Sequence, residues 1–179
     1  MNLAEERKLL ARAQAGPDGF GDLFDAHYER IYAYAYRRVG SRPAAEDIAA
    51  CTFEDALRGI QRVRWRGRPI IAWLYRIASR RVADYYRQAK EDAPLEAELV
   101  GAADDGALEQ AERQAAVRAG LGKLNPTDRE IIQLAYFDEC ETAEIAALLN
   151  CTANVVYVRL HRALRKLRAI LQGANDEME

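Results

Sequence analysis

The sequence predicts an all-α protein of two small helical domains joined by a flexible acidic linker. Apolar residues recur at helical spacing along most of the 179-residue chain, and no segment shows the alternating pattern of a strand in a sheet. Charge is also segregated: residues 58–90 hold ten Lys or Arg and one acid, whereas residues 91–112 hold eight acids and no Lys or Arg. We therefore expect domains at residues 1–90 and 108–179, with residues 91–107 as the linker between them.

Composition limits the kinds of site that the chain can hold. Half of its residues are apolar, which suffices for packed cores, and its net charge of −2 conceals the local basic segments. Cys51, Cys140 and Cys151 are far apart, and His27 and His161 have no partner at metal-ligand spacing, so we expect neither a metal nor a cofactor. No apolar run approaches the roughly 18 residues of a membrane span, so we expect a cytoplasmic protein without membrane insertion.

The first three helices follow from turn residues and apolar spacing. A short polar helix over residues 3–15 ends at Gly16, a longer one runs until Gly40 and Ser41 interrupt it, and Pro43 opens the third. The buried stripe predicted for the second helix comprises Phe20, Leu23, Phe24, Ile31, Tyr34 and Ala35. That of the third comprises Ala45, Ile48, Ala49, Thr52, Phe53, Ala56, Leu57 and Ile60.

Two acidic residues, Glu46 and Asp47, lie near the start of the third helix. We place them in its first turn, where carboxylates stabilise the helix dipole. They also point outward and would suit an Arg-rich partner, although helix physics alone favours the dipole role.

A basic loop over residues 61–69 contains Trp65 and leads into a fourth helix. The buried stripe of that helix comprises Ile70, Trp73, Leu74, Ile77, Ala78, Val82 and Tyr85. Arg76, Arg80 and Arg87 line up on its opposite side, at spacings of four and seven residues. Such a row beside an aromatic loop suits single-stranded nucleic acid, because cations follow phosphates and a ring stacks on an unpaired base. The alternative is a solvated basic helix with Trp73 in the core and Trp65 either buried or free.

The C-terminal domain is predicted to begin with two further helices. One starts near Leu108 and runs towards Leu124, and Asn125 caps the next, over residues 126–137. A turn over residues 138–141 then leads to the last two helices.

Those last two helices, over residues 142–171, form a predicted helix-turn-helix. Thr142 is the expected N-cap of the first, Asn150 tolerates the left-handed backbone of a three-residue turn, and the second begins near Thr152. The buried stripe of the second helix comprises Val156, Leu160, Ala163, Leu164, Leu167 and Leu171. Its other face carries Asn154, Tyr157, Val158, Arg159, His161, Arg162, Arg165, Lys166 and Arg168.

The charge on this last helix has one sign, since no acid lies between Glu144 and Asp176. The solvated face of an ordinary amphipathic hairpin usually mixes both signs. The one-sided charge therefore favours a helix-turn-helix that reads DNA.

Three motifs, in order along the chain, carry a family resemblance. The first is AED at residues 45–47 followed by Phe53, and the second is WLYRIA at residues 73–78 followed by Asp84 and Arg87. The third is LNPTDREIIQLAYF followed by VRLHRALRKLR, in which RLHRA is the most specific piece. Each motif alone is weak, but their order and spacing over nearly the whole chain resemble the bacterial sigma-70 superfamily, specifically its small extracytoplasmic-function (ECF) group.

The resemblance implies a dissociable RNA polymerase subunit that is not an enzyme. Its N-terminal domain would dock on the clamp helices of the largest polymerase subunit through Glu46, Asp47 and Glu54. The same domain would open the −10 promoter element and capture a flipped base of the non-template strand. The residues that match this function are Arg64, Trp65, Arg66, Arg68, Arg76, Arg80 and Arg87.

The resemblance also assigns the C-terminal domain to the −35 promoter element and to the flap of the second-largest polymerase subunit. The acidic linker would pass through the RNA channel, where it imitates nucleic acid. Besides core polymerase and promoter DNA, the resemblance adds an anti-sigma factor as a partner class. The residues that match −35 binding are Asn154, Tyr157, Val158, Arg159, His161, Arg162 and Arg165.

The chain departs from the family pattern at several of these positions. Ala50 and Cys51 stand where a Gln or an acid is common, and Arg80 stands where Asn is common. Tyr157 and Val158 replace a basic residue and a small hydroxyl, and Val158 can contact only apolar base edges such as a thymine methyl. The −10 and −35 preferences common in the family are therefore not carried over to this chain.

Two other kinds of function compete with a sigma factor. A dimeric helix-turn-helix regulator would explain the C-terminal domain but not the N-terminal motifs or the acidic linker. A nucleic-acid enzyme would need clustered carboxylates, a nucleophile–base pair or a phosphate loop, and the sequence contains none of these patterns.

Overall fold

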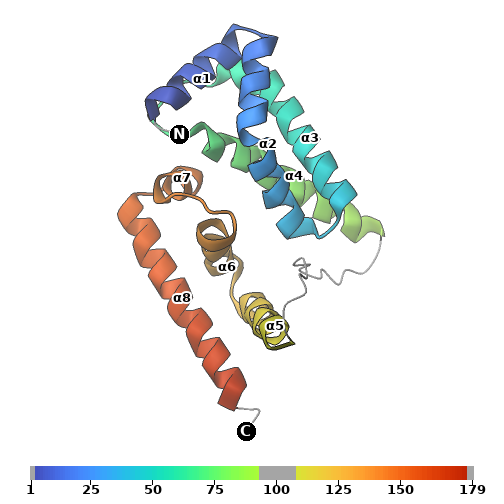
Figure 1. The fold of residues 1–179 in the computed structure, drawn as a ribbon, viewed down its shortest axis with the longest axis vertical. Coiled ribbons are helices and arrows are strands. Elements are labelled where there is room, and N and C mark those ends of the chain that lie inside the picture. Colours follow the sequence, from blue (N-terminus) through green and yellow to red (C-terminus); the bar gives the residue numbers. More distant parts are fainter. Residues whose placement is uncertain (1–2, 93–107, 177–179) are drawn as a thin grey trace. The chain divides into compact units, whose positions relative to one another are not determined.

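The computed structural model describes residues 3–92 and 108–176, and over these residues it consists of helices without any strand (Figure 1). The chain divides into two compact units, residues 1–100 and 101–179. The predicted all-α fold with two helical domains is thereby confirmed. Beyond Asp92, the predicted linker lies outside the described residues.

The N-terminal unit is built around α2, which packs against the other three α-helices of the unit. Its elements are α1 (Leu3–Ala15), α2 (Pro17–Val39), α3 (Arg42–Gly59), the 3₁₀ turn η1 (Ile60–Arg62) and α4 (Ile70–Asp92). Tyr34 of α2 and Tyr75 of α4 meet in the core, with ring centroids 4.9 Å apart. This packing places α3 and α4 side by side, with one face of each free.

The break between α2 and α3 lies where the turn residues predicted it. Gly40 adopts a left-handed conformation with φ of 67°, and its N–H donates to the carbonyl of Tyr36 at 2.9 Å. Ser41 is the N-cap of α3, which begins at Arg42. The first turn of α3 therefore contains no acid, and the predicted dipole role of Glu46 and Asp47 is wrong because both lie beyond that turn.

Two apolar residues predicted to be buried are exposed instead. Phe24 of α2 is 36% exposed and Leu57 of α3 is 53% exposed, while the other members of their two stripes are buried. Phe24 lies at the edge of its stripe, where its ring contacts Phe53 and begins a row of aromatic rings with Tyr28 along α2. The helical period predicted which face of α2 and of α3 is buried, but it did not predict how far the packing contact extends over that face.

The C-terminal unit is built on α8, which packs against α5, α6 and α7. Its elements are α5 (Leu108–Lys123), α6 (Pro126–Ile132), the wider π-helical turn η2 (Gln133–Phe137), α7 (Thr142–Leu148) and α8 (Ala153–Asp176). The side chain of Arg129 closes the C-terminal end of α5. Its Nε donates to the carbonyl of Leu121 at 2.8 Å, and its Nη2 to those of Gly122 and Leu124 at 2.6 and 3.1 Å.

The helix-turn-helix forms as predicted, with two local corrections. Asn150 has φ of 51°, but the connection between α7 and α8 covers residues 149–152 and is one residue longer than expected. The N-cap of α7 is Glu141, because Oε2 of Glu144 accepts from its backbone N–H at 2.9 Å. Thr142 is therefore the first residue of the helix and not its cap.

The described residues contain no helix that is long and apolar enough to cross a membrane. In the same part of the chain, no three His, Cys, Asp or Glu side chains are grouped as metal ligands would be. Cys51, Cys140 and Cys151 form no disulfide.

Candidate nucleic-acid interface

The candidate duplex-reading surface is the exposed face of α8. Val156, Ala163 and Leu167 are buried on the opposite face, which fixes the rotation of the helix about its axis. Every residue predicted to contact the −35 element is exposed as a result: Asn154, Tyr157, Val158, Arg159, His161, Arg162 and Arg165. All seven lie on α8, which is a straight helix (Figure 1, orange to red).

Apolar and basic side chains share this face. Tyr157 is 61% and Val158 is 49% exposed, so this face presents an apolar area beside its arginines. Tyr157 and Val158 lie in the first two turns of α8, and Arg159 and Arg162 follow them. The N-terminal part of a recognition helix is the part that enters the major groove, so base edges would meet an apolar pair flanked by arginines.

One basic side chain of α8 forms an ion pair within the C-terminal unit. Lys166 pairs with Asp128 near the start of α6, and its hydrogen bond is the main cause of the lowered pKa of that carboxyl. Asn125 contributes as well: its side-chain amide donates to Asp128 while its carbonyl oxygen caps α6. This pair ties α8 to the beginning of α6.

The arginines predicted to bind single-stranded nucleic acid form a row on α4, as expected, but they differ in exposure. Arg76 is half-buried, whereas Arg80 and Arg87 are exposed. Asp84 stands in the same row, and its Oδ1 lies 3.1 Å from Nη2 of Arg87. The exposed cations of this row are therefore Arg80 and Arg87, and Arg87 is paired with Asp84.

The basic loop ahead of α4 presents three exposed arginines, Arg64, Arg66 and Arg68, around a half-buried Trp65. Gly67 follows with φ of 66°, a left-handed conformation that a side chain at this position would disfavour. Trp73, which was expected in the core, is half-buried against Gly59. Trp65 is thus partly accessible, and Trp73 is less buried than its place in the stripe predicted.

The acids predicted to bind polymerase lie on the exposed face of α3, and two of them have arginine partners. Oε1 of Glu46 lies 3.1 Å from Nε of Arg42, and Oε2 of Glu54 lies 3.2 Å from Nη2 of Arg58. The hydrogen bond from Arg42 to Glu46 raises the pKa of that guanidinium. Asp47 is exposed on the same helix.

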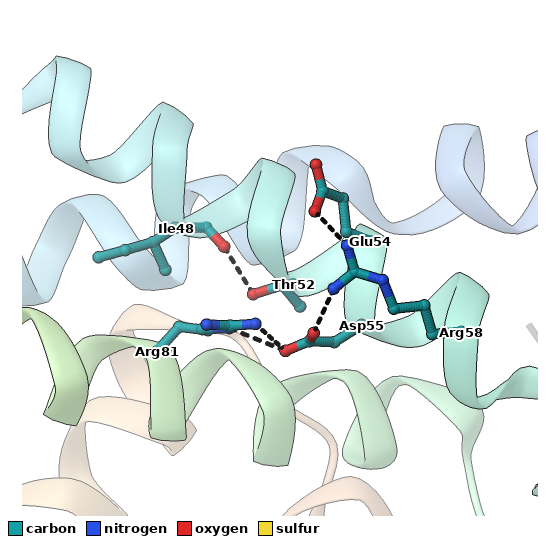
Figure 2. A network of polar contacts seen from close by, with 6 residues as sticks. All are labelled: Ile48, Thr52, Glu54, Asp55, Arg58 and Arg81. Atoms are coloured by element: carbon teal, nitrogen blue, oxygen red, sulfur yellow. Dashed lines mark hydrogen bonds and ion pairs between the residues drawn. The ribbon is translucent and has the colours of Figure 1, made fainter.

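Figure 2 shows how the pair at Glu54 continues to α4. Arg58 reaches both Glu54 and Asp55, and Nε of Arg81 on α4 donates to Oδ2 of Asp55 at 2.8 Å. This hydrogen bond is the main cause of the raised pKa of Arg81. Arg81 thus points towards α3, while its neighbour Arg80 is exposed.

The contacts of α1 with the basic loop and with the start of α4 were not predicted from the sequence. Glu6 is buried, and its Oε2 accepts from the backbone N–H of Ile70 at 2.5 Å, the first residue of α4. Nε2 of Gln14 donates to the carbonyls of Ile60 and Val63 at 2.9 and 2.7 Å. A signal existed: the residues before Ile70 are RGRP, which include no Ser, Thr, Asp or Asn that could cap α4 locally.

Both units match known sequence families. Residues 23–91 match the family described as Sigma-70 region 2, and residues 114–167 match Sigma-70, region 4. The chain is 30% identical to the ECF RNA polymerase sigma factor SigW of Bacillus subtilis, over 96% of this chain and 99% of SigW. It is 31% identical to the ECF RNA polymerase sigma factor BldN of Streptomyces coelicolor, over 94% of this chain but only 66% of BldN.

A solved structure agrees with these sequence matches. CnrH, determined in complex with the cytosolic domain of CnrY, is 29% identical to this chain and superposes with a TM-score of 0.65. The match covers 94% of this chain and 97% of CnrH. The chain therefore belongs to the ECF RNA polymerase sigma factors of the sigma-70 family.

Proposed function

We propose that this chain binds core RNA polymerase, recognises the −10 and −35 promoter elements and directs transcription initiation, without catalysing a reaction of its own. One observation carries the proposal: two separate basic surfaces lie on two helical units, and each unit matches a different region of the sigma-70 family. A sigma factor needs both surfaces because the two promoter elements are read in different forms, one as duplex and one as single strand.

The −35 element is assigned to the exposed face of α8. Its arginines supply both phosphate neutralisation and base contacts, and the apolar Tyr157 and Val158 favour a thymine methyl in the groove. The remaining contacts are assigned to Asn154, Arg159, His161, Arg162 and Arg165.

The −10 element is assigned to the basic loop over residues 61–69 and to the row of arginines on α4. The half-buried Trp65 offers a stacking surface for an unpaired base, and the arginines around it neutralise the phosphates on either side. The cations assigned to this strand are Arg64, Arg66, Arg68, Arg76, Arg80 and Arg87.

Polymerase docking is assigned to Glu46, Asp47 and Glu54 on α3, with the flap contacting the C-terminal unit and the acidic linker in the RNA channel. The pairs of Glu46 with Arg42 and of Glu54 with Arg58 are exposed. Exposed pairs of this kind contribute little to stability because solvent screens them, so a polymerase arginine can replace the internal partner at little cost.

We place the chain in the cytoplasm, where core polymerase is found, and propose regulation by an anti-sigma factor. The support for this partner class is that CnrH was solved in complex with the cytosolic domain of CnrY.

Run-off transcription from a pool of genomic promoters tests the function directly. We expect transcripts only when both core polymerase and this chain are present, and we expect binding to duplex promoter DNA to require core polymerase. A chain that shifts a palindromic duplex on its own, as a dimer, and gives no transcript with core polymerase would overturn the proposal in favour of a helix-turn-helix regulator.

A further inference from the structure

Helix α1 holds both ends of the loop that contains Trp65. At the beginning of the loop, the side-chain amide of Gln14 donates to the carbonyls of Ile60 and Val63, and Nε2 of Gln61 donates back to the carbonyl of Gln14 at 2.8 Å. At its end, Glu6 accepts from the N–H of Ile70. These contacts join residues 46 to 64 positions apart, so they are tertiary contacts and not features of the loop itself.

The contact at Glu6 replaces the local cap that α4 lacks. The first N–H groups of a helix have no partner within it, and a carboxylate at this end is also stabilised by the helix dipole. Glu6 is only 4% exposed, and a buried carboxylate is tolerated when hydrogen bonds compensate its lost hydration. The side chain that fixes the start of α4 is therefore supplied by α1.

The contact at Gln14 fixes the other end in the same way. Ile60 and Val63 lie in and just after η1, where the helical hydrogen bonds of α3 have ended. One amide group bridging both carbonyls restricts the direction in which the chain leaves η1. Between these two fixed ends, Gly67 in its left-handed conformation turns the loop.

We propose that α1 is a positioning element for strand capture, acting through Gln14 and Glu6 on the loop that carries Trp65. The inference rests on the capture function proposed above for that loop. A loop whose two ends are fixed loses less conformational entropy when a base stacks on it, so α1 increases strand affinity without contacting DNA.

The test uses Gln14→Met in the full chain bound to core polymerase. Methionine preserves the length of the side chain and removes its hydrogen-bond donor. The matched control is Ala11→Met, which places the same side chain at an exposed position of the same helix. The probe is the non-template −10 strand of a promoter found in the run-off experiment, supplied as a labelled single-stranded oligonucleotide.

We expect Gln14→Met to weaken binding of this oligonucleotide about three- to tenfold, which corresponds to one or two lost hydrogen bonds, while Ala11→Met stays near wild type. Polymerase binding is expected to be unchanged, because the acids of α3 are untouched. At the other end, Glu6→Gln keeps a carbonyl acceptor for Ile70 and should bind the oligonucleotide more tightly than Glu6→Met.

A second measurement reports on the loop without DNA. In a Trp73→Phe background Trp65 is the only tryptophan, and Gln14→Met should lower its fluorescence anisotropy. If Gln14→Met binds the oligonucleotide within twofold of wild type while Trp65→Ala binds it weakly, the capture function stands and the role of α1 is refuted. If Trp65→Ala also binds normally, the loop is not the capture site, and both proposals fail.

Discussion

The two candidate DNA surfaces differ in how the protein holds them in place. The exposed face of α8 is determined within a short stretch of sequence, because Val156 and Ala163 are buried on its other face and the turn at Asn150 lies just before it. The loop ahead of α4 is positioned by distant residues, since Glu6 and Gln14 of α1 hold its two ends. A surface of the first kind can be predicted from a short stretch of sequence, whereas one of the second kind requires the fold.

The strongest test of this contrast removes a local contact from the C-terminal unit. Arg129→Met deletes three charged hydrogen bonds, to the carbonyls of Leu121 and Gly122 at the end of α5 and of Leu124 just after it. We expect it to lower the free energy of unfolding of that unit by about 2–3 kcal/mol, because hydrogen bonds to charged groups are worth roughly 1.5–3 kcal/mol. Urea unfolding followed by circular dichroism measures the loss.

Tryptophan fluorescence provides the control for this variant. Both tryptophans, Trp65 and Trp73, lie in the N-terminal unit, so their unfolding transition should not move. Lys123→Met, an exposed change at the end of α5, should leave both transitions in place. A shift in tryptophan fluorescence for Arg129→Met would show that the two units do not unfold independently.

The duplex surface is tested by Arg162→Ala. Loss of an arginine that reads a base costs about 1–3 kcal/mol and relaxes specificity at one position. We therefore expect weaker transcription from the preferred −35 sequence and a smaller penalty for one of its variants, measured across a set of −35 substitutions. Unchanged transcription from every −35 variant would remove Arg162 from the reading surface.

The single-strand surface is tested by Trp65→Ala. Stacking of a base on an aromatic ring is worth about 1–3 kcal/mol, and duplex binding by α8 does not involve this loop. Polymerase recruitment should therefore persist while strand opening, followed by permanganate footprinting, declines. Normal opening by this variant would show that the Trp65 ring takes no part in strand capture, and the loop would not be the capture site.

The smallest expected effect concerns the pair that joins α8 to α6. The hydrogen bond from Lys166 lowers the pKa of Asp128 below its unfolded value of about 3.9, so the stabilisation is complete above that pH and is lost as the pH falls through the folded pKa. We expect at most about 1 kcal/mol, because Lys166 is exposed. Unfolding of the C-terminal unit between pH 5 and pH 2 measures it, and Asp128→Asn should reduce the pH dependence. An equally steep acid transition in Asp128→Asn would assign the effect to other carboxyls.

Much of the fold was predictable because its signals are local. Gly40, Asn125 and Asn150 each adopt the conformation or cap that their residue type favours, and α1, α5 and α8 begin or end close to the predicted residues. All seven residues predicted to face the duplex are exposed on α8, because a period of 3.6 residues fixes which side of a helix is buried.

The failures have two causes, one local and one tertiary. Glu141 and not Thr142 caps α7, because a carboxylate three residues on completes the cap, and Phe24 and Leu57 are exposed because apolar spacing says nothing about how far a neighbouring helix extends. The ion pair between Asp55 and Arg81 spans 26 residues, and the contact of Glu6 with Ile70 spans 64. Such contacts depend on which helices become neighbours, and helical periodicity does not specify that.

The segregation of charge has a consequence for handling the protein. A chain with net charge −2 would be expected to pass through a cation exchanger at neutral pH. Adsorption depends on the local field of a surface and not on the sum over the chain, and α8 presents exposed arginines without any acid before Asp176. The protein should therefore be retained by heparin or sulfonate resins and, through its acidic segments, by anion exchangers as well. Elution from both kinds of resin should depend steeply on the salt concentration.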